Sequence, residues 1–136
     1  MSALLDTGFI LALLSTNDPH HAACKAVMAN ERSPLLPTPV LPELAYMTIR
    51  NLGHSEYISF LRFALAGRPK LVFATSVDFA RATDIMEKYT DSRIDFVDCV
   101  IAAMAERLNI SRILTVDQRH FRLLRPLHIP SFDILP

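Results

Sequence analysis

The stretch DFVDCVIAAMAERLNISRILTVD, residues 95–117, decides the fold class of this chain. Apolar residues recur at helical spacing in its first part and predict an amphipathic helix over residues 95–108. The run ILTV at residues 113–116 predicts a short buried strand that ends at Asp117. A helix that leads directly into a buried strand is typical of α/β proteins with a parallel sheet.

The rest of the chain alternates in the same way. Short strands are expected at residues 3–6, 35–36 and 71–73, with a last strand within residues 129–134. Helices are expected at residues 8–14, from Asp18-Pro19 onward, at 41–52 before Gly53, from a cap at Ser55 to Gly67, and from a cap at Ser76 to about residue 89. We predict one α/β domain, residues 1–136, with a mostly parallel sheet of about four to five strands.

Composition indicates a globular protein and excludes several other classes. The chain has 136 residues, 51% of them hydrophobic, only three glycines, and 14 basic residues against 14 acidic ones. This zero net charge argues neither for nor against a nucleic-acid partner. The two cysteines lack the spacing of a zinc site or a disulfide framework, so we expect free thiols in the cytoplasm. The N-terminus does not resemble a signal peptide, and no apolar run is long enough to span a membrane.

Four carboxylates lie where an apolar segment ends or a helix begins: Asp6, Glu43, Asp98 and Asp117. If the apolar runs are neighbouring parallel strands, all four project from the edge where such sheets bind ligands. Two carboxylates about 4 Å apart repel by about 4 kcal/mol at an effective dielectric of about 20. A divalent cation relieves that repulsion, and all-oxygen ligation suits Mg²⁺ or Mn²⁺ rather than zinc or copper.

Each acid also has an ordinary structural role available to it. Asp6 is suited to cap a helix and Asp117 to sit in a turn, while Glu43, Asp95 and Asp98 are suited to oppose a helix dipole. Ser92 and Asp95 also resemble a capping box. The four acids taken together indicate a functional site more specifically than any one of them alone. Asp98 shares a helix face with Ala102 and Ala105, whose small side chains let the helix pack closely and bring the carboxylate inward.

Four segments together resemble the PIN domain, in particular toxins of the VapC type: residues 5–10 (LDTGFI), 40–44 (VLPEL), 95–105 (DFVDCVIAAMA) and 114–121 (LTVDQRHF). The resemblance implies a three-layer α/β/α fold and places the family's acidic quartet on Asp6, Glu43, Asp98 and Asp117. Asp95 falls on a supplementary acid, and Thr115 on a hydroxyl near the metal. Cys99 departs from the alanine that commonly follows the third acid.

The resemblance implies an endoribonuclease that depends on Mg²⁺ or Mn²⁺. Asp6, Asp98 and Asp117 would hold the metal, and Glu43 would complete that shell or position the attacking water. The resemblance also implies an inhibitory antitoxin protein, received by a clip of two helices that carries Tyr46 and Phe63, and a homodimer. Near Asp117 lie Arg112, Arg119, His120, Arg122 and Arg125, and we expect Arg119, Arg122 and Arg125 to contact RNA phosphates.

Two alternatives stay open from the sequence. A PIN-type nuclease with a housekeeping role in RNA processing would have the same residues. A phospho-accepting signalling domain is also α/β with acidic residues and Mg²⁺ at strand ends. That chemistry requires a lysine after a late strand, and the only lysines are Lys25, Lys70 and Lys88.

Overall fold

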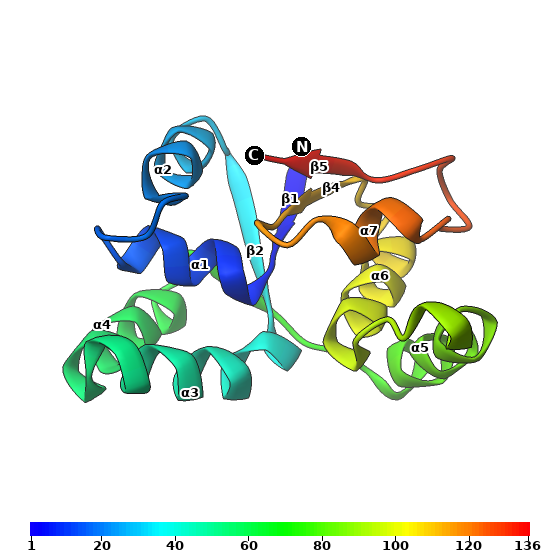
Figure 1. Cartoon of the computed structure of the whole chain (residues 1–136), viewed down its shortest axis with the longest axis horizontal. Coiled ribbons are helices and arrows are strands. Elements are labelled where there is room, and N and C mark those ends of the chain that lie inside the picture. The colour runs from blue at the N-terminus through cyan, green and yellow to red at the C-terminus, as the bar shows by residue number, and fades with distance from the viewer.

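A five-stranded parallel sheet forms the centre of the computed structural model, which describes all 136 residues (Figure 1). Its strands are β1 (Ser2–Leu5), β2 (Ser33–Pro37), β3 (Lys70–Val72), β4 (Arg112–Leu114) and β5 (Asp133–Leu135). They lie in the order β3-β2-β1-β4-β5, and every neighbouring pair is parallel. The predicted mostly parallel sheet of about four to five short strands is confirmed.

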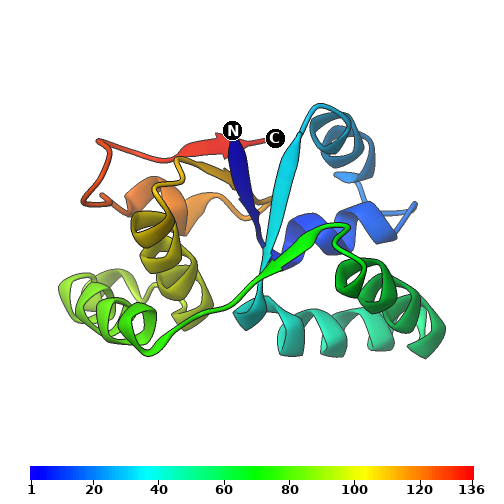
Figure 2. The same ribbon diagram turned by 180° about the vertical axis from the view of Figure 1, so that it is seen from behind.

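Seven α-helices cover the sheet: α1 (Thr7–Leu14), α2 (His21–Ala29), α3 (Leu41–Leu52), α4 (His54–Leu65), α5 (Ser76–Lys88), α6 (Phe96–Leu108) and α7 (Arg119–Leu123). Helices α1 to α4 lie on one side of the sheet and α5 to α7 on the other, as both views show (Figures 1 and 2). The expected three-layer α/β/α arrangement is therefore present. None of these helices has the length and apolar character needed to cross a membrane.

Three predicted helix starts differ from the structure. Asp18 does not cap α2; its Oδ1 accepts a hydrogen bond from the backbone N–H of His20, and the helix begins at His21. Helix α4 begins directly after Gly53, so Ser55 lies inside its first turn. Helix α5 is capped by Thr75, one residue before Ser76. The shifts are of one or two residues, and the exact residue at which a helix begins is what sequence patterns specify least well.

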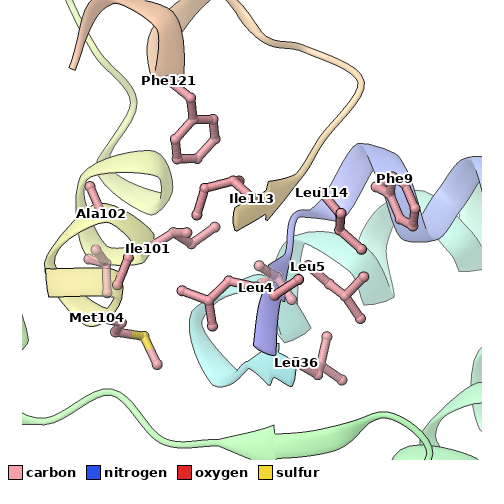
Figure 3. Close-up of a cluster of buried hydrophobic side chains, with 14 of the residues drawn as sticks. Leu4, Leu5, Phe9, Leu36, Ile101, Ala102, Met104, Ile113, Leu114 and Phe121 are labelled. Atoms are coloured by element: carbon pink, nitrogen blue, oxygen red, sulfur yellow. The ribbon is translucent and has the colours of Figure 1, made fainter. Parts of the chain in front are cut away.

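The core lies on both faces of the central strands (Figure 3). On one face, Leu4 of β1 and Ile113 of β4 point toward α6 and α7. On the other face, Leu5 and Leu114 point toward Phe9 of α1 (Figure 3). All of these side chains are fully buried. The central strands have helices on both faces, so their sequences are uninterrupted apolar runs rather than alternating ones.

The strand order places a topological switch point between β1 and β4. The chain leaves β1 and builds β2 and β3 on one side of it, then returns to place β4 on the other side. Ligands of open α/β sheets bind outside the carboxyl ends of the strands at such a point. Asp6 follows β1 directly and Asp117 follows β4 by three residues, so both lie at this crevice.

Candidate active site

Asp6 is held at the end of β1 by two hydrogen bonds. Its Oδ1 accepts from the backbone N–H of Thr7 at 2.8 Å, and its Oδ2 accepts from Oγ1 of Thr115 at 2.8 Å. The first bond makes Asp6 the N-cap of α1, so the structural role and the predicted site role fall on one residue. Burial raises the pKa of Asp6 above its ordinary value. The hydrogen bonds from Thr115 and Thr7 act in the opposite direction, and the charges of Glu43 and Asp117 add smaller upward contributions.

Asp98 reaches the same edge from the first turn of α6. It is 9% exposed, and the helix face around it consists of small buried residues, as the sequence predicts. Burial, together with the smaller effect of the charges of Asp6, Asp95, Asp117 and Glu43, raises the pKa of Asp98 to about 8. These carboxylates therefore lie near enough to repel one another.

The other three acids are more accessible to solvent. Glu43 is half-buried in the first turn of α3, and Asp117 and Asp95 are exposed. Asp95 is the N-cap of α6 but makes no side-chain capping bond, so its carboxylate is not used by that helix.

The Thr115 hydroxyl, which donates to Asp6, also contacts the segment after β4. The backbone carbonyl of Asp117 accepts a hydrogen bond from Oγ1 of Thr115 at 3.1 Å. Thr115 thus connects the ends of β1 and β4 through its hydroxyl group, and its predicted place near a metal ion stays a prediction.

The donor set fits a divalent cation of the Mg²⁺ or Mn²⁺ kind. All four acids of the predicted quartet offer carboxylate oxygens, and none of them forms an ion pair with a lysine or an arginine. As the side chains stand, no three histidine, cysteine, aspartate or glutamate residues converge closely enough to ligate one ion. Binding at Asp6, Asp98 and Asp117 therefore requires the more accessible carboxylates to move toward the two buried ones.

The predicted basic cluster is only partly assembled. Arg112 lies at the opposite end of β4, where it pairs with Glu31 at 2.8 Å and with Asp133 at 3.3 Å. Arg119, Arg122 and Arg125 lie on or just after α7 and are exposed. None of these three pairs with a carboxylate, so their charges remain available.

Sequence reasoning placed His120 only within the basic cluster around Asp117 and predicted no contact between it and an acid. In the structure its Nδ1 lies 2.7 Å from Oδ2 of Asp98, and both residues are buried. The signal available in the sequence was its spacing, because His120 follows Asp117 by three residues and lies in the first turn of the short helix α7.

The fold and the acidic crevice at the switch point define the class of this protein. The chain belongs to the PIN domain family, whose model matches residues 3–125. Its sequence is 31% identical over 134 residues to Ribonuclease VapC26 of Mycobacterium tuberculosis. The alignment covers 98% of this chain and 99% of that one. A phospho-accepting signalling domain is a different family, so that alternative is excluded.

Solved structures share the fold at lower sequence identity. The toxin VapC20 of Mycobacterium tuberculosis, described as cleaving the sarcin-ricin loop, superposes with a TM-score of 0.76 at 20% identity, over 82% of this chain and 86% of that one. VapBC2 of Rickettsia felis, bound to a DNA fragment from its promoter, gives a TM-score of 0.72 at 16% identity over 100% of both chains. These likenesses support the fold assignment.

Proposed function

We propose that this chain is a cytoplasmic endoribonuclease that depends on Mg²⁺ or Mn²⁺, and that it is the toxin of a toxin–antitoxin pair. The observation that carries this proposal is the set of carboxylates, unpaired with lysine or arginine, at the switch point between β1 and β4. The relative at 31% identity, which is named as a ribonuclease, supports RNA as the substrate.

Residues of the crevice would have three roles in the reaction: binding the cation, activating the attacking water, and holding a carboxylate in position. Asp6, Asp98 and Asp117 would hold the cation, and Asp95 would add charge at the rim. A bound divalent cation neutralises phosphate charge and lowers the pKa of a water ligand. Glu43, which is half-buried beside them, would orient the attacking water or accept its proton. Thr115 keeps the Asp6 carboxylate in place through its 2.8 Å hydrogen bond.

Substrate binding would rest on the exposed arginines of α7 and the segment after it. Arg119 is adjacent in sequence to His120, which contacts Asp98, so its guanidinium lies at the margin of the acidic crevice. Arginine binds phosphate oxygens through paired N–H groups. We expect Arg119, Arg122 and Arg125 to bind the RNA backbone on either side of the cleaved bond.

RNA cleavage by the purified chain tests this function. The parent should cleave RNA with Mg²⁺ or Mn²⁺ and stop when chelator is added. Asp6→Asn and Asp98→Asn should each lose at least about 100-fold in rate, since each removes a charge from the set that holds the cation. Asp91→Asn, an exposed acid outside the crevice, is the matched control and should cleave as the parent does. Full activity in chelator, in a preparation free of contaminating nuclease, would exclude the metal mechanism.

An antitoxin partner is proposed because similar structures are named as toxin–antitoxin complexes, VapBC of Salmonella typhimurium among them. The expected clip is the pair α3–α4, which Tyr57 joins through a 3.2 Å hydrogen bond to the carbonyl of Leu41. Tyr46 and Phe63 on these helices are 65% and 59% exposed, so apolar surface is available to a partner helix.

Purification of the chain from its native source should recover a small protein bound in a stoichiometric complex, identified by mass spectrometry. Tyr46→Asp and Phe63→Asp should each weaken that complex, whereas Arg125→Asp, on the opposite helical layer, should leave it unchanged. A free and active enzyme whose expression does not harm its host would favour the housekeeping alternative.

A further inference from the structure

His120 makes the only side-chain hydrogen bond that reaches Asp98. Its Nδ1 lies 2.7 Å from Oδ2 of the carboxylate, and the two residues are 8% and 9% exposed. The contact joins residues that are 22 positions apart, because α7 packs against α6 after the chain has passed through β4. Asp117 and His120 therefore approach the crevice on one short segment.

The second ring nitrogen of His120 determines which way this hydrogen bond runs. Nη2 of Arg119 lies 3.3 Å from Nε2 of His120. A guanidinium group can only donate hydrogen bonds, so Nε2 serves as the acceptor and we assign the ring hydrogen to Nδ1. The imidazole then donates from Nδ1 to the Asp98 carboxylate.

We propose that His120 is a positioning residue that fixes the carboxylate of Asp98 for a divalent cation. This inference rests on the proposed metal-dependent function. The hydrogen bond occupies Oδ2 and sets the rotation of the carboxylate, while Oδ1 has no hydrogen-bond partner in the protein. Groups that hold a metal ligand in this way typically contribute 10- to 100-fold to metal affinity.

The same arrangement occurs at the other buried acid of the crevice. Thr115 donates to Oδ2 of Asp6 at 2.8 Å, as His120 does to Oδ2 of Asp98. Each of the two buried acids of the crevice is thus held by a donor from the segment that runs from the end of β4 into α7. A carboxylate without such a donor would turn toward solvent, since the nearby charges push it away.

Metal binding in the absence of RNA tests the proposal. Mn²⁺ would be titrated into metal-free protein, with affinity measured by calorimetry and by the electron paramagnetic resonance signal of free Mn²⁺. His120→Leu keeps much of the side-chain volume but removes the donor, and we expect its dissociation constant to rise about 10- to 100-fold. His120→Asn places an amide nitrogen near the Nδ1 position and should remain within about 3-fold of the parent.

Two further variants separate positioning from simple packing. His128 also makes a 2.7 Å hydrogen bond, to the carbonyl of Ile110, and its side chain does not contact the acids, so His128→Leu is the matched control and should bind Mn²⁺ normally. His120→Gln carries its amide at the Nε2 position, and it should lose affinity while His120→Asn keeps it. This Asn–Gln pair decides the matter even if His120→Leu does not fold.

Three results would overturn the proposal: equal affinity in His120→Leu and the parent, equal loss in His120→Asn and His120→Gln, or no Mn²⁺ binding by the parent. Normal Mn²⁺ binding with the expected order of variants, but no cleavage of any RNA, would uphold the role of His120 and overturn the proposed nuclease function instead.

Discussion

At the scale of single residues, Asp98 should make the free energy of unfolding depend on pH. Its pKa is about 8 in the folded, metal-free protein against an ordinary value of 3.8, because burial and then the charges of neighbouring carboxylates oppose its ionisation. A raised carboxyl pKa contributes stability that is complete below about pH 4 and is lost as the pH rises toward 8. We therefore expect the free energy of unfolding in chelator to fall between pH 5 and pH 8.

Urea denaturation at a series of pH values, in chelator, measures this slope. Asp98→Asn should show a weaker decline and should be more stable than the parent at pH 8, by on the order of 1 kcal/mol after solvent screening. If Asp98 served only as a favourable charge at a helix start, the asparagine variant would instead lose a few tenths of a kcal/mol, about 0.3. A less stable variant at pH 8 would contradict repulsion within the crevice.

Asp78 should make stability depend on pH in the opposite direction, with a loss of stability at acid pH. Burial opposes ionisation of its carboxylate, but hydrogen bonds from Arg107 and from Thr75 outweigh burial and lower its pKa below 3.8. Its contribution is present above about pH 4 and is lost as the pH falls through the lowered pKa. Asp78→Ala should destabilise by about 2 to 4 kcal/mol at pH 7, since it removes the acceptor for the Thr75 backbone N–H in the capping box of α5 and leaves Arg107 without its carboxylate partner.

Chemical denaturation at pH 7 and pH 3 provides the measurement for Asp78. The difference between parent and variant should shrink at the lower pH, because the parent carboxylate begins to bind a proton as the pH falls toward its lowered pKa. Asp84→Ala, an exposed acid in the same helix, is the control and should change stability by less than about 0.5 kcal/mol.

At the scale of elements, Gly8 permits the close approach of α1 to the end of β4. A Cβ at this position would lie 2.8 Å from Cγ2 of Val116, a stiff β-branched side chain directly before Asp117. Alanine is favoured over glycine within a helix by about 1 kcal/mol, so the sign of Gly8→Ala depends on that contact. We expect Gly8→Ala to destabilise the parent but to stabilise a Val116→Ala background.

Thermal melts of the two single variants and the double variant would reveal this coupling. If Gly8→Ala changes stability equally in both backgrounds, the two positions are independent. That result would show that the side chain of Val116 does not limit the approach of α1. The displaced Val116 should also shift Asp117, so Gly8→Ala in the parent should weaken Mn²⁺ binding even where the fold persists.

At the scale of the whole molecule, cation binding should stabilise the fold. A ligand that binds only the native state adds RT ln(1 + [L]/Kd) to the free energy of unfolding. Mg²⁺ should therefore raise the melting temperature of the parent, and should raise that of Asp98→Asn by less. Calorimetric scans with and without Mg²⁺ make this comparison, and equal shifts in both proteins would place the ion elsewhere.

Self-association is the second expectation for the molecule as a whole. Phe79 and Phe96 stack with ring centroids 6.2 Å apart while 44% and 45% exposed, which leaves apolar surface on α5 and α6. We expect a homodimer by light scattering at micromolar concentration, and a shift toward monomer in Phe79→Glu. Leu123→Glu, which changes an exposed apolar residue of α7, is the control. A monomeric parent would contradict the homodimer.

The sequence by itself determined the alternation of strands and helices and the four acids of the crevice. Apolar runs and helical periodicity are local properties, so the sheet and helix α3, which ends before Gly53, followed from the spacing of residues alone. The carboxyl ends of parallel strands share one edge, so Asp6 and Asp117 could be placed together without coordinates.

Only the tertiary structure decided which side chains hold those acids. His120 and Asp98 lie 22 positions apart, and Thr115 and Asp6 lie 109 apart, and no local pattern encodes either hydrogen bond. Arg112 belongs to the basic run by sequence, yet the direction of β4 carries it to the other end of the sheet and into a pair with Glu31. These outcomes depend on how α6, α7 and the strands pack, because packing alone brings side chains that are distant in sequence within the 2.7 to 2.8 Å of these two hydrogen bonds.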